Sequence, residues 1–560
     1  MSEKEPSASV DDILAARLQA DPTGVPNLDM VLGGGLPRGA LVIIVGPPGS
    51  GKTTLANQMA FAAARAGRRA MVLAALSEPT SKLIAHLRSF TFFDDELTGE
   101  AIQFLSLQQF LSGGLETTGN EMVAAARRAH SNFVVLDGFR GVRGVDLDPQ
   151  AARKFLYDVG TTLSILGATT IITSEADPRD PAFFPEATTA DIIIGLHFDL
   201  LGIRQRRRLE VIKMRGAAPL PGLHGLALSE DGVVIYPRLE TRITLASQAP
   251  QPETVNYEDA DNIINDEIAS PRNRVLFDLP ELDTLLGGGL TRHTNSLVLG
   301  SIATGKTLLG LHFTLAGVRR GEQAIFLGFR ESYRQLLLKT SPFALGSELR
   351  AALAPGGGLT LLRWAPVELN ADILATELLQ ALDRTGAKRL VVDSITELER
   401  AAMESGDPRR VENYMAALVE ALHRRGVTAL FIREVPQELG WPPDLSIEPT
   451  AILAENMLLL RQVEQRGVLH RVVSVQKMRF SAHDSTKLRE FKIEVPTCIQ
   501  VLAPDGSNAQ LIGSTEQGQS KRHARAPKSD QAQSGRARRS QPRKRDTGPW
   551  TSDEDTPPEA

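Results

Sequence analysis

Two stretches of the 560-residue chain combine glycine, lysine and threonine at the spacing of a phosphate-binding loop. Residues 46–53 and 300–307 both match G-x4-G-K-[ST], between an aliphatic run and a helix-forming stretch. In such a loop glycines let backbone N–H groups surround a phosphate, the lysine neutralises the β- and γ-phosphates, and the threonine ligates magnesium. We therefore predict two sites for a nucleoside triphosphate with Mg²⁺. The predicted nucleotide contacts are Gly46, Gly49, Ser50, Gly51, Lys52, Thr53, Thr54, Gly300, Ser301, Ala303, Thr304, Gly305, Lys306, Thr307 and Leu308.

Each loop is followed downstream by a carboxylate at the end of an apolar run. Asp137 follows Phe133–Leu136, and Asp393 follows Leu390–Val392. If both runs are strands, each carboxylate lies beside the phosphate loop, where it can hold the magnesium shell. The alternative is an Asp that caps the next helix. The predicted metal-binding residues are Thr53, Asp137, Thr307 and Asp393.

Two glutamates favour hydrolysis over binding alone. Glu78 and Glu331 each follow the first expected strand after a loop helix, Met71–Leu76 in one copy and Ile325–Phe329 in the other. A carboxylate in this position can orient or deprotonate the attacking water. A solvated surface glutamate is the alternative.

A Lys-Met-Arg triplet occurs twice, each time at the end of an expected strand. The predicted functional residues are Lys213 and Arg215 in the first copy and Lys477 and Arg479 in the second. A period of two places Lys and Arg on one face and Met on the other. Such a pair can reach across a subunit interface and stabilise charge on the γ-phosphate, as an arginine finger does. The alternative is an exposed basic strand edge.

The residues above recur because the chain repeats itself. An offset of 254 residues carries Gly33–Leu36 onto Gly287–Leu290 and Lys52 onto Lys306. Short aliphatic runs separated by helix-length amphipathic segments predict parallel strands buried on both faces, and hence an α/β fold. The expected strands are Leu41–Val45, Ala70–Leu73, Phe133–Leu136, Thr170–Ile172, Ile192–Ile194, Leu209–Ile212, Ser296–Leu299, Ala324–Leu327, Leu390–Val392, Ala429–Ile432, Met457–Leu460 and Val472–Val475.

Composition changes along the chain give the expected domain boundaries. A stretch rich in Pro, Asp, Glu and Asn separates the two copies, and the last part of the chain is polar and basic. We expect an N-terminal extension over 1–22, a first domain over 23–246, a linker over 247–271, a second domain over 272–504 and a disordered basic tail over 505–560.

The overall composition, 42% hydrophobic and 23% charged, is that of a soluble globular protein. No apolar stretch approaches the roughly 20 residues of a membrane helix, and the N-terminus lacks the apolar core of a signal peptide. A single cysteine, Cys498, excludes an internal disulfide, so we expect a cytoplasmic protein. The net charge of −5 argues against a nucleic-acid-binding body, although ten Lys and Arg in residues 521–545 could contact phosphates.

The glycine-rich blocks, the two loops, the strand-end aspartates and the two Lys-Met-Arg triplets together resemble the KaiC family, double-domain RecA-type ATPases known from a bacterial circadian oscillator. The resemblance covers about residues 23–240 and 276–495. It implies two tandem RecA-like P-loop NTPase domains, each a mostly parallel twisted sheet with helices on both faces. It also implies ATP as the nucleotide, a hexameric double ring, and Lys and Arg acting across the interface between neighbouring chains.

The chain departs from the family at the catalytic position, where members usually carry two adjacent glutamates. Here the pairs are Ser77-Glu78 and Arg330-Glu331, and neither serine nor a permanently charged guanidinium serves as a base. The resemblance also implies autophosphorylation on adjacent Ser and Thr. Ala451-Ile452 stand at those places, with Thr450 the nearest hydroxyl, so this activity is expected to be lost.

The favoured hypothesis is an ATP-driven oligomeric switch for an unidentified signalling partner. A nucleotide-gated scaffold with negligible hydrolysis is a second possibility, since one glutamate of each pair is missing. A serine/threonine autokinase of the family type is a third. A DNA motor or recombinase is the least favoured, because only the basic tail supports it.

Overall fold

The computed structural model describes residues 20–74, 79–113, 115–138, 149–177, 188–201, 203–246, 273–404, 407, 409–435, 453–465, 467–480 and 487–503. The expected linker and the expected basic tail lie outside these residues, as does most of the expected N-terminal extension. Among the helices that are described, none is long and apolar enough to cross a membrane.

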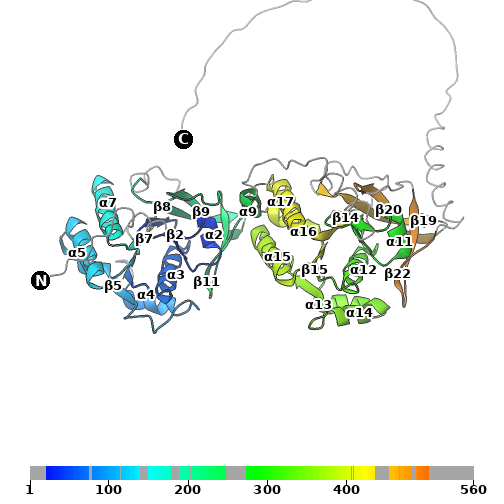
Figure 1. Cartoon of the computed structure of the whole chain (residues 1–560), viewed down its shortest axis with the longest axis horizontal. Helices are drawn as coiled ribbons and strands as arrows, with labels where there is room; N and C mark the ends of the chain where they lie inside the picture. The colour runs from blue at the N-terminus through cyan, green and yellow to red at the C-terminus, as the bar shows by residue number, and fades with distance from the viewer. Residues whose placement is uncertain are drawn as a thin grey trace, which may run out of the picture. The chain divides into compact units, whose positions relative to one another are not determined.

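The first domain is built on a nine-stranded sheet in the order β11-β10-β9-β8-β3-β7-β6-β4-β5 (Figure 1). The six strands from β8 to β5 are parallel, and β9, β10 and β11 extend the sheet as antiparallel strands. The strands are β3 (Leu41–Val45), β4 (Ala70–Ala74), β5 (Ile102–Ser106), β6 (Phe133–Leu136), β7 (Thr169–Ser174), β8 (Ile192–Leu201), β9 (Arg204–Met214), β10 (His224–Ser229) and β11 (Gly232–Tyr236).

Alternate residues of β3 belong to two separate hydrophobic clusters. Val42 and Ile44 pack with residues of α2 and α3, while Leu41 and Ile43 pack with residues of α5 and α7. The sheet is therefore covered on both faces, which is why its central strands are continuous apolar runs. The helices are α2 (Leu28–Leu32), α3 (Lys52–Arg65), α4 (Thr80–Leu87), α5 (Leu115–Arg128) and α7 (Pro149–Ile165).

The second domain repeats this plan with the strand order β16-β15-β17-β18-β14-β19-β20-β21-β22. Again six strands, from β16 to β19, are parallel, and β20, β21 and β22 are antiparallel. The strands are β14 (Asn295–Gly300), β15 (Ala324–Gly328), β16 (Leu359–Arg363), β17 (Arg389–Asp393), β18 (Thr428–Glu434), β19 (Asn456–Gln465), β20 (Val468–Met478), β21 (Leu488–Glu494) and β22 (Cys498–Val501). The predicted pair of RecA-like α/β domains is thus confirmed.

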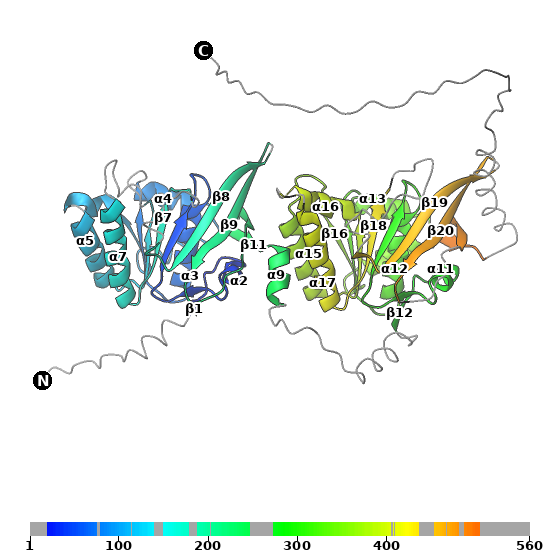
Figure 2. The same cartoon turned by 90° about the horizontal axis from the view of Figure 1, so that it is seen from above.

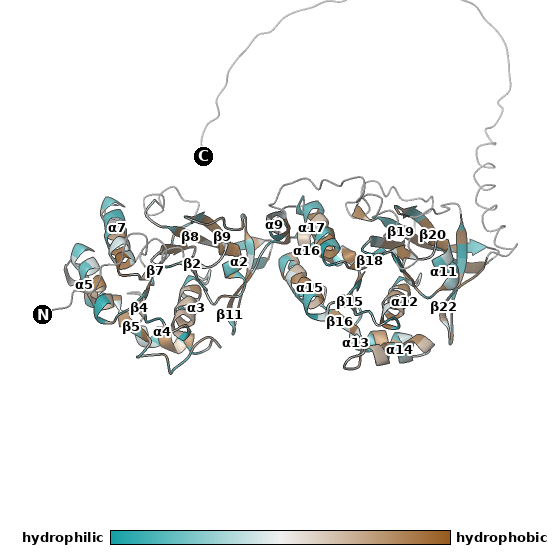
Figure 3. Ribbon diagram, in the orientation of Figure 1, coloured by the Kyte–Doolittle hydropathy of each residue, from teal (hydrophilic) through white to brown (hydrophobic). Residues whose placement is uncertain are grey.

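Helices cover both faces of the second sheet as well (Figure 2). Figure 3 shows their hydrophobic sides, in brown, turned toward the strands. The helices are α11 (Pro280–Leu285), α12 (Lys306–Val318), α13 (Tyr333–Thr340), α14 (Ala344–Ala352), α15 (Ala371–Thr385), α16 (Ile395–Met403) and α17 (Arg410–Arg424). Helix α9 (Leu239–Ala246), which follows β11, packs on α17, and its Leu239 and Ile243 contribute to the core of the second domain.

Candidate nucleotide-binding sites

Both predicted phosphate loops connect a central strand to the helix that follows it. The first loop joins β3 to α3 and the second joins β14 to α12. An added Cβ at Gly46 or Gly300 would lie 2.4 or 2.6 Å from a carbonyl oxygen of the neighbouring strand, so only glycine fits there. Gly51 and Gly305, with φ of +101° and +96°, take the left-handed conformation directly before each helix. These glycines bring the loop backbone to the helix N-terminus, where anions bind.

The other predicted loop residues occupy the same segments. Leu308 is buried at 5% exposure among the core residues of the second domain, so only its backbone N–H is offered to a ligand. The remaining predicted contacts lie either in the loops or in the first helical turns: Gly49, Ser50, Thr54, Ser301, Ala303 and Thr304.

The loop lysines lie at the centre of their loops. Lys52 Nζ donates to the carbonyl oxygens of Gly46 and Pro47, both at 2.9 Å. Lys306 Nζ donates to Gly300 and Ser301 at 2.8 and 2.6 Å. Burial lowers the pKa of each ammonium, and nearby carboxylates counteract this effect in both sites. A partly desolvated ammonium surrounded by backbone dipoles is suited to binding a polyphosphate.

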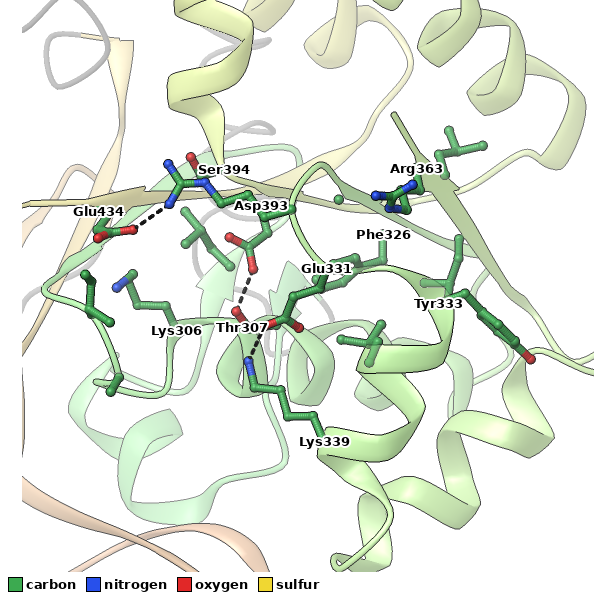
Figure 4. Close-up of a pocket in the computed structure, with 18 residues that line it drawn as sticks. Lys306, Thr307, Phe326, Glu331, Tyr333, Lys339, Arg363, Asp393, Ser394 and Glu434 are labelled. Atoms are coloured by element: carbon green, nitrogen blue, oxygen red, sulfur yellow. Dashed lines mark hydrogen bonds and ion pairs between the residues drawn. The ribbon is translucent and has the colours of Figure 1, made fainter. Parts of the chain in front are cut away.

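Each loop threonine meets the predicted aspartate. Thr53 Oγ1 donates to Asp137 Oδ1 at 3.1 Å, and Thr307 Oγ1 donates to Asp393 Oδ2 at 2.6 Å (Figure 4). Burial raises the pKa of Asp393, and the hydrogen bond from Thr307 opposes that rise. A hydroxyl and a carboxylate at one point suit Mg²⁺, which takes oxygen ligands and usually one or two carboxylates in addition to substrate phosphates.

A cavity of about 660 Å³ opens beside the second loop. Lys306, Thr307 and Asp393 line it, together with the predicted catalytic Glu331. Glu331 Oε1 accepts a hydrogen bond from Lys339 Nζ of α13 at 2.7 Å, so the carboxylate is held at the cavity wall (Figure 4). Glu78, the predicted counterpart in the first domain, lies outside the described residues.

Comparison with known proteins agrees with this geometry. The family described as "ATPase: KaiC" matches residues 21–240 and 278–506, which include both loops and both strand-end aspartates. The chain belongs to the KaiC ATPase family.

Three relatives within this family match over most of their length. The circadian clock oscillator protein KaiC of Picosynechococcus sp. is 26% identical over 483 residues, covering 84% of this chain and 87% of the relative. The circadian clock protein KaiC3 of Synechocystis sp. is 25% identical over 485 residues, covering 84% and 90%. The circadian clock oscillator protein KaiC of Thermostichus vulcanus is 25% identical over 494 residues, covering 86% and 88%.

The Lys-Met-Arg triplets of this KaiC-family chain lie away from the loops of their own domains. Lys213 is in register with Ile43 of β3, two strands to the side, and the backbone N–H of Arg215 donates to Asp191 near the beginning of β3. The loop, in contrast, follows the other end of β3. Lys477 and Arg479 have the equivalent place beside β14 and are absent from the lining of the cavity around the second loop. The structure does not bring either triplet to its own loop.

An acidic residue lies near each loop lysine and was not predicted from the sequence. Glu175 follows β7 directly, and Glu434 ends β18; each counteracts the lowering of the pKa of the loop lysine in its own domain. The signal was present, because each glutamate follows a predicted strand. The sheet order places β7 and β18 next to the loop strands, and only this order brings each glutamate near the loop lysine.

Arg330 was identified from the sequence only as a residue unable to act as a base. In the structure it lines the same cavity and forms ion pairs with Glu397 at 3.3 Å and with Glu434 at 3.1 Å. The second site therefore contains a guanidinium at the position where the resemblance implied a carboxylate.

Proposed function

We propose that the chain binds ATP with Mg²⁺ at both loops, hydrolyses it, and thereby switches an oligomeric ring between states that differ in affinity for partner proteins. The observation that supports this most strongly is the duplicated meeting of a loop threonine and a strand-end aspartate, at Thr53–Asp137 and Thr307–Asp393. Membership of an ATPase family supports ATP as the nucleotide.

In this proposal the loop backbone and the lysines Lys52 and Lys306 bind the β- and γ-phosphates. Mg²⁺, bound beside the Thr–Asp pairs, would neutralise charge that develops on the phosphate oxygens. Glu78 and Glu331 orient a water molecule and accept its proton as the water oxygen bonds to the γ-phosphorus and the bond to ADP breaks.

The Lys-Met-Arg triplets support an assembly of several chains. Each Lys-Met-Arg triplet lies beside the beginning of the loop strand, away from its own loop, and this position supports a role at the nucleotide of a neighbouring chain. A closed ring, which we propose to be a hexamer, gives every site such a neighbour. The relatives are named circadian clock proteins, and for this chain we propose a timing or signalling switch acting on a partner protein.

The enzymatic part is tested by phosphate release. We expect turnover by the full chain to disappear in the Lys52→Ala/Lys306→Ala double variant and to persist in Lys492→Ala, which removes a lysine on β21 whose nearest described carboxylate is 3.9 Å away. Calorimetry with saturating Mg²⁺ should count two nucleotides per chain, and one in each single loop variant. Equal turnover by the double variant and the unmodified chain would contradict ATP hydrolysis at these loops.

A nucleotide-gated scaffold is the second candidate, and Arg330 is the observation that favours it, since a guanidinium cannot activate water. The two candidates are separated by native mass measurement with ATP and with ADP alongside turnover. ATP-dependent rings without phosphate release would establish the scaffold. Labelled ATP and mapping of incorporated phosphate test the autokinase alternative, and we expect no incorporation.

A further inference from the structure

Arg330 occupies an unusual electrostatic position in the second site. Its side chain is 57% exposed and reaches the cavity that Lys306 and Asp393 also line. Its Nε lies 3.3 Å from Glu397 and its terminal nitrogen lies 3.1 Å from Glu434. The dashed line at Glu434 in Figure 4 marks the second contact.

The two carboxylates depend on Arg330 to different degrees. Glu397 is buried, with a side chain 2% exposed, and it has a second cation, Arg400, at 3.1 Å. Glu434 is 34% exposed, and it is the carboxylate that most strongly counteracts the lowering of the Lys306 pKa by burial. Glu434 thus pairs with Arg330 and lies near enough to Lys306 to act on its pKa, and both cations line the cavity beside the loop.

A role limited to neutralising buried charge does not account for this arrangement. Such a role would place the guanidinium inside the protein, whereas more than half of the Arg330 side chain remains accessible. Buried Glu397 already has Arg400 as a partner. The accessible face of the guanidinium is available to an anion in the cavity.

We propose that Arg330 binds the γ-phosphate of the nucleotide in the second site and gives that site its preference for a triphosphate over a diphosphate. This proposal rests on the proposed nucleotide-binding function. When the γ-phosphate is present, the guanidinium exchanges its ion pair with Glu434 for a pair with the phosphate oxygens. With a diphosphate it stays on Glu434. Arginine suits the exchange because its planar fork can bind either a carboxylate or a phosphate through two parallel hydrogen bonds.

The proposed ion-pair exchange would also make the two nucleotide sites of the chain differ in how they recognise the γ-phosphate. The corresponding residue in the first copy is Ser77, which is neutral. At this position the second site thus carries a cation that the first copy lacks. A change of partner by Arg330 would alter the ion pairs at the end of β18, where Glu434 lies, and at the start of α16, which carries Glu397.

The test measures affinity ratios in the full chain with the first loop silenced by Lys52→Ala. Binding of a non-hydrolysable ATP analogue and of ADP, each with Mg²⁺, is measured by calorimetry. Since a hydrogen bond to a charged group contributes about 1.5–3 kcal/mol, we expect Arg330→Ala to reduce the ATP-analogue/ADP affinity ratio by about tenfold or more. ADP affinity should change by less than about threefold, and Arg330→Lys should restore part of the ratio.

Arg400→Ala is the matched control, because Arg400 pairs with the same Glu397 and does not line the cavity. Its affinity ratio should equal that of the Lys52→Ala parent. Glu434→Gln supplies a variant that keeps Arg330: it should raise the ratio, and the increase should vanish when combined with Arg330→Ala.

The outcomes separate the inference from the function on which it rests. If the Lys52→Ala parent binds neither nucleotide, the proposed second site is wrong and the role of Arg330 fails with it. If the parent binds both and Arg330→Ala keeps the parental ratio, the nucleotide site stands and Arg330 is not its γ-phosphate contact. An equal loss in Arg400→Ala would overturn the assignment in favour of a structural role for the charge cluster.

Discussion

Glu331 has one oxygen of its carboxylate fixed at 2.7 Å from Lys339, a residue of the following helix α13. The contact holds the carboxylate at the wall of the cavity that contains Lys306 and Asp393. A base positioned in this way can take a proton from water only if the water lies between it and the γ-phosphate. The proposed role of Glu331 therefore differs from that of Thr307 and Asp393, which concern the metal.

The corresponding prediction is that Glu331→Gln abolishes hydrolysis at the second site without weakening nucleotide binding. Loss of a general base typically costs 10²–10⁴-fold, so we expect single-turnover phosphate release in a Lys52→Ala chain to fall by about 100-fold or more. Glu348→Gln, which alters an ion pair on α14 instead, is the control. Unchanged release in Glu331→Gln would assign the carboxylate a purely structural contact with Lys339.

Helix α12, which follows the second phosphate loop, carries a buried histidine as its seventh residue. His312 is 8% exposed, and its Nε2 has no hydrogen-bond partner within the part of the chain that the structure describes. Burial is the main cause that lowers its pKa from 6.5 to about 4, and Arg319 adds to the effect. The folded chain therefore holds this imidazole neutral over a pH range in which the unfolded chain protonates it.

This neutral histidine makes the stability of the folded chain depend on pH. Because the folded pKa is the lower one, the unfolded state binds the proton first, so this contribution to stability is lost as pH falls from 6.5 toward 4. In His312→Leu this loss of stability at low pH should be absent. The free energies of unfolding of the two chains should therefore diverge as pH falls, by up to about 3 kcal/mol for a 2.5-unit shift in pKa. Denaturant midpoints of both chains at pH 7.5, 6 and 5 measure it, and the difference at pH 7.5 isolates packing. Parallel pH curves for the two chains would contradict the prediction.

Helix α9 is attached to the second domain through a buried charge cluster. Arg410 of α17 donates to Glu240 of α9 at 2.7 and 3.1 Å and also to Asp372 of α15. The side chains of all three are 12% exposed or less. Removing one member of such a cluster leaves unpaired buried charge, so the cost exceeds that of an exposed ion pair.

We predict that Arg410→Ala destabilises the chain by about 3–5 kcal/mol and increases hydrogen exchange in α9. Arg424→Ala, in the exposed (i, i+4) pair with Glu420 on the same helix, should cost less than about 1 kcal/mol. Denaturant unfolding and amide exchange over residues 239–246 measure both effects. Similar results for the two variants would show that the cluster does not anchor α9.

The elements next to the loops could be predicted from sequence because their signals are local. Strands β3 and β6 have the predicted bounds, and β17 ends at the predicted Asp393. The antiparallel strands were largely missed, since β9 carries four arginines in Arg204–Met214 and lacks a long apolar run. Its predicted part, Leu209–Ile212, is only the apolar segment.

The contacts around the second site could not be predicted because they depend on strand order. Glu434 ends β18, which lies between β14 and β17 although it comes after β17 in the sequence. Only that order places Glu434 beside both Lys306 and Arg330. The ion pair between Glu331 and Lys339 likewise depends on how α13 leaves β15.

At the scale of the whole molecule, the proposed role of the Lys-Met-Arg triplets would make ATP hydrolysis a property of an assembly. Lys477 Nζ donates to the carbonyl oxygen of Ala454 at 2.6 Å, and Lys213 Nζ donates to that of Thr188 at 3.3 Å, both away from the loop that follows the neighbouring central strand. If Arg215 and Arg479 act on nucleotide, the loop they serve belongs to another chain. Two differently inactivated chains should then complement each other.

We therefore predict that Lys52→Ala/Lys306→Ala and Arg215→Ala/Arg479→Ala chains, each inactive alone, regain phosphate release when mixed under conditions that allow subunit exchange. In a closed ring formed at random from equal amounts, a site is complete when a finger-variant chain supplies the loop and a loop-variant chain supplies the finger. This occurs at about one interface in four, so about a quarter of the original turnover should return. Recovery of turnover should require ATP-dependent assembly, which native mass measurement monitors. It should be absent when only one of the two variants is present. Assembled mixed rings with no recovered turnover would mean that the triplets do not act across interfaces, because a triplet that acts only within its own chain never meets the intact loop of the other variant.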